Sequence, residues 1–87
     1  MDSYNLRYKP SVEKDLVHLP RSVVLRVSKC MENLASNPFP RGVVKLTGSD
    51  RLYRARVGVY RIVYEVDDSA HCITIHYVRH RRDAYRK

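Results

Sequence analysis

Apolar residues alternate with polar ones over residues 4–8, which is the period of a half-buried strand. The alternation ends at Lys9. Pro10 then suits the first position of a helix, with Ser11 as an alternative capping residue. Apolar side chains at helical spacing follow as far as Leu19. The pattern therefore predicts a strand followed directly by a short helix.

A second apolar stripe begins after Pro20 and recurs at helical spacing from Arg21 to Leu34. Pro38 and Pro40 end this helix, because proline removes a helical hydrogen bond and restricts the residue before it. We expect two helices joined by a short turn, forming a hairpin with one apolar side.

After Gly42 the period of the pattern changes from that of a helix to that of a strand. Turn residues separate four predicted strands, over residues 43–46, 52–57, 60–66 and 72–78. In the last of them, Ile73, Ile75 and Tyr77 are expected to point to one side of the sheet.

The order of these elements is strand, helix, helix and then hairpin-linked strands, which predicts an α+β fold. The helical hairpin would cover one face of a mostly antiparallel sheet and leave the other face open, in two layers. A chain of 87 residues has the length of one small domain, so residues 1–87 are expected to form a single domain. A domain of this size buries about 60–65% of its unfolded surface, so chemistry is expected on an exposed face.

The charge of the chain indicates a polyanionic partner. Lys and Arg number 17 against 9 Asp and Glu, which gives a net charge of +8. Eleven of these basic residues and five of the acidic ones lie in residues 41–87. The anion is therefore expected to bind mainly to the second half of the chain.

Several classes of protein are excluded by the same sequence. Apolar runs reach three residues at most, whereas about 20 are needed to span a bilayer. The first residues are unlike a signal peptide, so we expect a cytoplasmic protein with no membrane partner. Cys30 and Cys72 are expected to remain reduced as small buried residues. The histidines lack metal-ligand spacing, and neither a metal nor another cofactor is expected.

Residues 54–64 gather arginines on a predicted β-hairpin. Gly58, at the first central position of a two-residue loop, favours a type II′ turn. In that register Arg56 lies opposite Arg61, and Arg54 shares their face of the sheet, away from the helices. Like charges in a cross-strand pair are unfavourable, which suggests that an anion normally lies between them. Arginine suits phosphate because its planar fork donates two parallel hydrogen bonds. A solvated basic face is the alternative.

A second basic group follows the last predicted strand and runs from Arg79 to Lys87. This group also contains His80 and Tyr85. Because it directly follows a core strand, we expect a helical turn that brings its side chains beside the arginine face. A disordered basic tail is the alternative.

Taken together, these segments resemble RelE-type toxins of the RelE/ParE superfamily, from type II toxin–antitoxin modules. The resemblance covers nearly the whole chain and includes residues 9–16, 34–38 and 44–48. It is most specific over residues 53–64 and 80–86. It implies a RelE-like fold, in which an N-terminal strand and a helical hairpin pack on one sheet face, with a short C-terminal basic helix or tail.

The resemblance implies a metal-independent, ribosome-dependent endoribonuclease that cuts messenger RNA in the decoding site and inhibits translation. In such a reaction the ribose 2′-hydroxyl attacks the neighbouring phosphate and leaves a 2′,3′-cyclic phosphate and a 5′-hydroxyl. The implied partners are the ribosome, its messenger and a cognate antitoxin, RelB-like or similar. The toxin would be a monomer when free and part of a heteromeric complex with its antitoxin.

The resemblance also assigns roles to individual cations. Arg61 and Arg81 match phosphate-stabilising positions, while Arg54 and Arg56 match two basic positions on one strand. Both Arg61 and Arg81 are expected on the open face, where truncation leaves no buried cavity. Further contacts to the RNA are expected from Lys45, Arg79, Arg82 and Arg86.

The general base cannot be an arginine, because arginine does not lose its proton in proteins. Some family members carry lysine at the positions of Arg54 and Arg56, so proton abstraction must fall to another residue in this chain. Tyr85 matches a family tyrosine, and nearby cations favour its phenolate. His80 is the other candidate, because its ordinary pKa is close to neutral.

Two other functions remain open. ParE-type relatives block DNA gyrase, but they generally lack the arginine-plus-tyrosine set. A small basic nucleic-acid-binding module without catalysis would stack bases on tyrosines. The hairpin register places Tyr53, Tyr60 and Tyr64 on the helix-facing side, however, where they would pack into the core.

Overall fold

The computed structural model of the protein describes residues 3–84. Its elements are β1 (Asn5–Tyr8), α1 (Pro10–Val17), α2 (Arg21–Ser36), β2 (Val44–Lys45), β3 (Leu52–Val57), β4 (Tyr60–Asp67), β5 (Cys72–His80) and α3 (Arg81–Ala84). Each predicted element is present. Strand β5 extends to His80, past its predicted end at residue 78, because it stays paired with β4.

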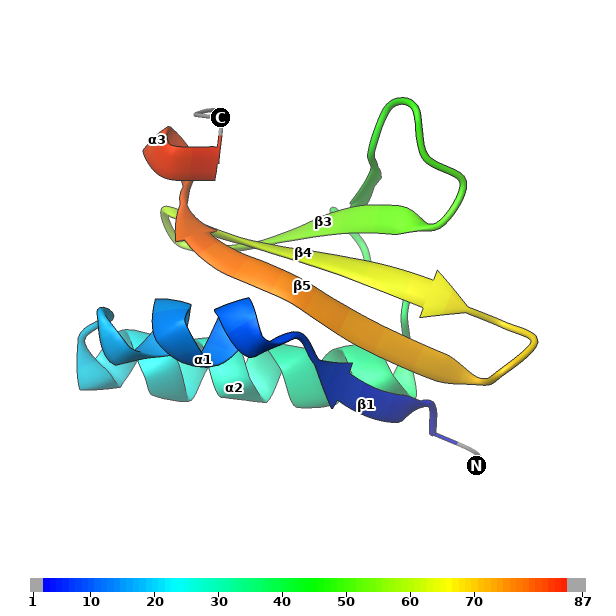
Figure 1. The fold of residues 1–87 in the computed structure, drawn as a ribbon, viewed down its shortest axis with the longest axis horizontal. Helices are drawn as coiled ribbons and strands as arrows, with labels where there is room; N and C mark the ends of the chain where they lie inside the picture. The colour runs from blue at the N-terminus through cyan, green and yellow to red at the C-terminus, as the bar shows by residue number, and fades with distance from the viewer. Residues whose placement is uncertain (1–2, 85–87) are drawn as a thin grey trace.

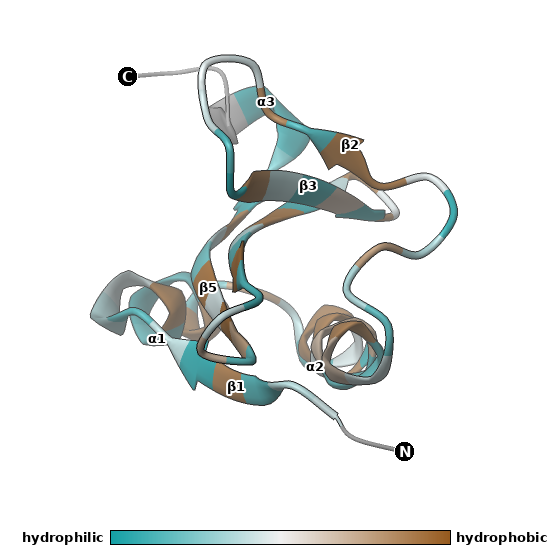
Figure 2. Ribbon diagram, turned by 90° about the vertical axis from the view of Figure 1, so that its right-hand side faces the viewer, coloured by the Kyte–Doolittle hydropathy of each residue, from teal (hydrophilic) through white to brown (hydrophobic). Residues whose placement is uncertain are grey.

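The strands form one mixed sheet in the order β1-β5-β4-β3-β2, in which β1 is parallel to β5 and the other pairs are antiparallel. Helices α1 and α2 lie on one side of the sheet, and α3 lies on the other (Figure 1). Figure 2 looks along α2 and shows the sheet curving over this helix. The predicted α+β fold with two layers is confirmed.

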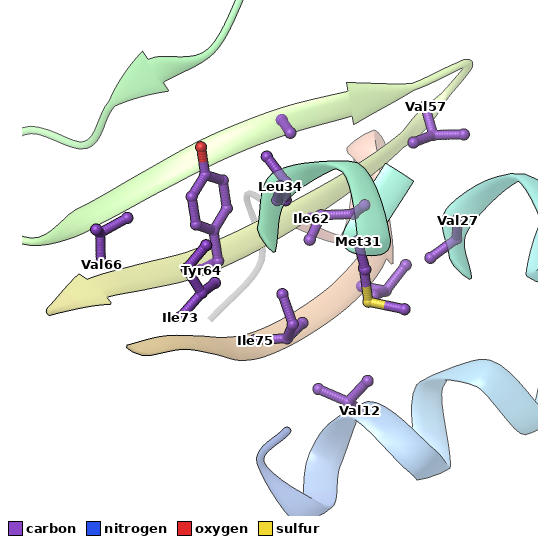
Figure 3. Packing of buried hydrophobic residues seen from close by; sticks show 12 residues of the cluster. Val12, Val27, Met31, Leu34, Val57, Ile62, Tyr64, Val66, Ile73 and Ile75 are labelled. Atoms are coloured by element: carbon purple, nitrogen blue, oxygen red, sulfur yellow. The ribbon is translucent and has the colours of Figure 1, made fainter. Parts of the chain in front are cut away.

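The core lies between the two long helices and the central strands (Figure 3). Val27, Met31 and Leu34 come from one stripe of α2, and their spacing is that of the predicted amphipathic helix. Tyr64 of β4 is 0% exposed, and its hydroxyl donates a hydrogen bond of 2.6 Å to the carbonyl oxygen of Pro38. This bond fixes the segment after α2 to the sheet.

One extra residue in β5 shifts its register against β4. Val63 pairs with Tyr77, but the next residue of β4, Tyr64, pairs with Ile75. His76 is therefore left over, as in a β-bulge. We call residues 75–77 the β5 bulge.

The β5 bulge changes which side chains face the core. Ile73 and Ile75 are fully buried there, as expected. Past the bulge the buried residue is Val78, and Tyr77 lies on the opposite face, across from Val63. The prediction for Tyr77 is wrong, because it assumed regular alternation and a bulge shifts the alternation by one residue.

Candidate functional site

The β3–β4 hairpin has the predicted register. Gly58 adopts a φ of +59°, which suits glycine and is required by a type II′ turn. Arg56 pairs with Arg61, and Arg54 pairs with Val63. Directly paired residues share a face of the sheet, and so do residues two positions apart along a strand. Arg54, Arg56 and Arg61 therefore share one face, as predicted.

Strand β5 adds a third arginine beside this pair. Arg61 lies opposite Arg56 of β3 on one side and opposite Arg79 of β5 on the other. We call Arg56, Arg61 and Arg79 the arginine row. Neighbouring residues across antiparallel strands have Cα atoms about 4.5–5.5 Å apart, so the row concentrates positive charge. The repulsion within it would be relieved by an anion bound among the guanidinium groups.

Arg61, in the middle of the row, is 5% exposed. The expectation that it lies on an open face is wrong. It has an arginine on either side, and α3 lies over this face of the sheet, in contact with β4 and β5 (Figure 1). Removing a guanidinium from water is costly. The fold therefore holds one cation in a sheltered position between two more accessible ones.

Tyr77 lies beside the arginine row. The guanidinium carbon of Arg79 is 4.2 Å from the centre of the Tyr77 ring, which is a cation–π contact. This contact orients Arg79 on the face of the sheet. Sequence reasoning missed Tyr77 because its place in a regular apolar alternation gave no sign of the β5 bulge.

Arg54 extends the basic face beyond the row. Its Nε atom is buried and has no hydrogen-bond partner among the residues that the structure describes. A buried donor without a partner costs about 1–3 kcal/mol. An anionic oxygen close to Arg54 would satisfy this donor.

Helix α3 begins next to the hairpin turn. The backbone N–H of Arg81 donates a 2.7 Å hydrogen bond to the carbonyl oxygen of Val59. Arg81 and Arg82 are exposed, and with Val59 and His80 they line a hollow in the surface. The expected helical turn on the arginine side of the sheet is confirmed. Two candidate residues, Tyr85 and Arg86, lie outside the described residues.

His80 is not brought to the arginine row. It pairs with Tyr60 on the helix-facing side of the sheet, and the two ring centres are 5.5 Å apart in an edge-to-face contact. Its Nδ1 atom accepts a 3.1 Å hydrogen bond from the backbone N–H of Arg82. A neutral imidazole that accepts at Nδ1 carries its proton on Nε2. In this arrangement the lone pair of Nδ1 is already used as a hydrogen-bond acceptor.

Lys45 also lies away from the arginine row. It pairs with Tyr53 on the helix-facing side of the sheet. The three tyrosines expected on that side are found there: Tyr53 packs against the core, Tyr60 lies beside His80, and Tyr64 is buried. These rings are therefore not a platform on which bases stack beside the arginines.

The end of the arginine face far from the hairpin turn carries opposite charges that pair with each other. His76 Nε2 lies 3.1 Å from Glu65 Oε1. Arg51 Nη1 lies 4.0 Å from Glu65 Oε2 and 3.7 Å from Asp67 Oδ2. The acidic residues of this face thus contact Arg51 and His76, and the arginine row forms the strongly positive end of the face.

Within residues 3–84, no three His, Cys, Asp or Glu side chains are grouped so as to hold a metal ion. Cys30 and Cys72 are free thiols, and burial raises the pKa of Cys30. No helix in the described part of the chain is long and apolar enough to cross a membrane.

Comparison with known proteins identifies the family. Residues 6–85 match the family described as ParE toxin of type II toxin–antitoxin system, parDE. The putative toxin RelE1 of Methanocaldococcus jannaschii is 34% identical over 86 residues, which cover 95% of this chain and 96% of that protein. Toxin RelE of Mycobacterium tuberculosis is 30% identical over 87 residues, with coverage of 95% and 87%.

Solved structures agree with this relationship. The archaeal RelE–RelB complex from Pyrococcus horikoshii OT3 matches with a TM-score of 0.81 at 33% identity, covering 91% of this chain and 96% of that chain. The toxin–antitoxin complex RelBE2 of Mycobacterium tuberculosis matches with a TM-score of 0.78 at 27% identity, with coverage of 90% and 98%. The two-layer fold is thus that of a small toxin. The chain belongs to the RelE/ParE superfamily and is a RelE-like toxin of a type II toxin–antitoxin system.

Proposed function

We propose that this toxin is a ribosome-dependent endoribonuclease that cuts messenger RNA in the decoding site and thereby inhibits translation. The arginine row is the observation that carries the proposal. It presents three guanidinium groups from three adjacent strands, with Arg81 at the start of α3 on the same side of the sheet. This arrangement suits a phosphodiester of an RNA strand.

The chemistry begins when the ribose 2′-oxygen attacks the adjacent phosphorus in line with the leaving 5′-oxygen. Negative charge then builds on the non-bridging phosphate oxygens. One preorganised donor at such a position is commonly worth about 10²–10³ in rate. Arg61 is sheltered and Arg79 is oriented over Tyr77, so both are held in place before the substrate arrives. The bond between phosphorus and the 5′-oxygen breaks, and the 5′-oxygen takes up a proton from water. The products are a 2′,3′-cyclic phosphate and a 5′-hydroxyl.

We assign proton abstraction to Tyr85. His80 is on the other face of the sheet, and its Nδ1 is already an acceptor. Tyr85 comes directly after the last residue of α3, the helix that lies on the arginine side. Arg81, Arg82 and Arg86 are close to Tyr85 in the sequence, and nearby cations favour a phenolate, which would accept the proton of the 2′-hydroxyl.

The proposed partners are the ribosome with its messenger and a cognate antitoxin. The structural relatives were solved as complexes of RelE with RelB. A net charge of +8 with a concentrated arginine row suits an antitoxin that neutralises this face. Because ribosomes are the proposed target, the site of action is the cytoplasm.

A second candidate function is inhibition of DNA gyrase, because the matching family is described as ParE toxin. The arginine row and the adjacent basic helix favour the nuclease. A phosphate site with sheltered cations serves bond cleavage, whereas blocking an enzyme requires only a complementary surface.

The experiment compares the two activities directly. Purified toxin is added to ribosomes programmed with a defined messenger, and RNA ends are mapped. We expect cleavage within the decoding site, with 5′-hydroxyl ends that ligate only after phosphorylation. In parallel, gyrase supercoiling is assayed with the same preparation. Intact messengers together with inhibited supercoiling would replace the nuclease by the gyrase inhibitor.

A further inference from the structure

Helix α1 binds the backbone of the β5 bulge and of the residue after it through two side chains. The Ser11 hydroxyl donates a 2.7 Å hydrogen bond to the carbonyl oxygen of His76. The Asp15 carboxylate accepts a 3.0 Å hydrogen bond from the backbone N–H of Val78. Residues four apart on a helix lie on the same side, so Ser11 and Asp15 present their polar groups to β5 together.

These bonds lie where β5 loses a strand neighbour. The last partners along the parallel pair are Tyr8 and Ile75, followed by a 2.9 Å bond from Lys9 N–H to the Ile75 carbonyl oxygen. Past that point, among the described residues, β5 pairs with β4 alone. A bulge leaves backbone groups out of the ladder, and buried backbone groups need partners. The side chains of α1 supply them.

The β5 bulge decides which side chains reach the arginine row. With it, Tyr77 and Arg79 lie on the face of Arg61, and Val78 lies in the core. Regular alternation continued from Ile75 would turn Tyr77 and Arg79 toward the helices and Val78 outward. The presence of Arg79 in the arginine row therefore depends on the single extra residue of the β5 bulge.

We propose that Ser11 and Asp15 are positioning residues for the arginine row, holding β5 in the bulged register from the opposite face of the sheet. The inference rests on the proposed function, because it gives these residues a role in phosphate binding and cleavage. Neither side chain touches the substrate in this scheme. Each side chain holds the backbone of β5, and that backbone determines on which face of the sheet Arg79 lies.

The test compares Asp15→Ala, Asp15→Asn and Ser11→Ala with Lys14→Ala, an exposed neighbour on the same helix. Asparagine keeps an oxygen that accepts the Val78 N–H, so Asp15→Asn should behave like wild type. Asp15→Ala should lower the single-turnover cleavage rate about 10- to 100-fold, since small misplacements of a catalytic group have effects of that size. Ser11→Ala should lower the rate in the same direction, and Lys14→Ala should not.

A second readout separates positioning from loss of structure and does not require cleavage. Arginine Nε–H signals of the full chain are followed by NMR while inorganic phosphate is added. In wild type and Asp15→Asn, phosphate should shift the signals of both Arg56 and Arg79. In Asp15→Ala, the signal of Arg56 should still shift while that of Arg79 does not, and the Val78 amide should exchange faster.

The outcomes distinguish the two proposals. If Asp15→Ala exposes the Val78 amide but Arg79 still responds to phosphate and cleavage is unchanged, the positioning role is wrong. If Asp15→Ala does not fold, Ser11→Ala is judged by the same two signals. A third outcome is that wild type cleaves no RNA while phosphate shifts the Arg79 signal in wild type and not in Asp15→Ala. In that case the nuclease proposal fails, and the role of Asp15 in positioning Arg79 stands.

Discussion

Arg61 and Arg79 are direct cross-strand neighbours, but they differ in their exposure to solvent. Arg61 is buried, whereas Arg79 is partly exposed and lies over the ring of Tyr77. A sheltered charge provides a fixed field, and an accessible charge can form direct hydrogen bonds with a ligand. Arg61 would thus stabilise a bound anion through its field, and Arg79 would also form hydrogen bonds with it.

Arg79→Ala is expected to lower messenger cleavage about 10²-fold or more, because it removes a preorganised cation. Arg21→Ala provides a control of equal charge change, since Arg21 is exposed on α2 across the sheet. The measurement is single-turnover cleavage on programmed ribosomes. Equal losses for both variants would mean that net charge, and not the arginine row, limits the reaction.

Arg61→Met is expected to abolish cleavage without lowering stability. The substitution fills most of the buried space and removes two like-charge neighbours, each costing a few tenths to about 1 kcal/mol. A methionine also avoids the cost of taking a guanidinium out of water. Urea unfolding at low salt checks this prediction. A clear loss of stability would show that Arg61 holds the fold together.

Binding of single-stranded RNA should weaken steeply with salt. Each phosphate contact contributes about −0.7 to the slope of log K against log salt for single strands. Arg79→Ala should make that slope shallower by roughly this amount. Fluorescence anisotropy of a labelled oligonucleotide at several salt concentrations gives the slope. A wild-type affinity that does not change with salt would rule out phosphate contacts.

The base can be identified with two conservative variants. Tyr85→Phe removes the hydroxyl and should reduce cleavage strongly, as much as Tyr85→Ala, if the phenolate takes the proton. His80→Gln should have little effect on the rate, because His80 lies across the sheet from the row. Rates measured from pH 6 to 9 complete the test. A large effect of His80→Gln with a small one of Tyr85→Phe would reverse the assignment.

Stability should fall above pH 10 because of Tyr64. Burial raises the pKa of Tyr64 above its ordinary value of 10.0, and the hydrogen bond to Pro38 also favours the protonated form. The unfolded chain loses this proton near pH 10, whereas the folded chain keeps it, so unfolding becomes easier as pH rises further. Urea unfolding at pH 8 to 11 should show this decline. Tyr64→Phe should be less stable at pH 8 by about 1–2 kcal/mol and should show a smaller decline.

The sequence alone was sufficient to predict the register of the β3–β4 hairpin, but it did not predict the register of β5. A two-residue loop with Gly58 restricts the turn type, and the turn type sets the register that pairs Arg56 with Arg61. The β5 bulge has no such local cause. It is supported by Ser11 and Asp15, more than 60 residues away in the chain. The pairing of His80 with Tyr60 and of Arg79 with Arg61 therefore required the tertiary structure.

The dependence of β5 on one extra residue has an evolutionary consequence. Strands β3 and β4 alternate regularly between the two faces of the sheet, so a substitution on the arginine face does not change which residues face the helices. In β5, deletion of His76 would remove the extra residue of the β5 bulge and keep Ile75 and Val78 in the core. Deletion of a core-facing residue such as Ile73 would instead exchange the two faces on one side of the deletion. Single-residue deletions are therefore expected to be tolerated in the loop at residues 46–51 and at His76, and eliminated by selection at the core-facing residues of β5. A library of single-residue deletions, selected for loss of toxicity, would reveal this contrast.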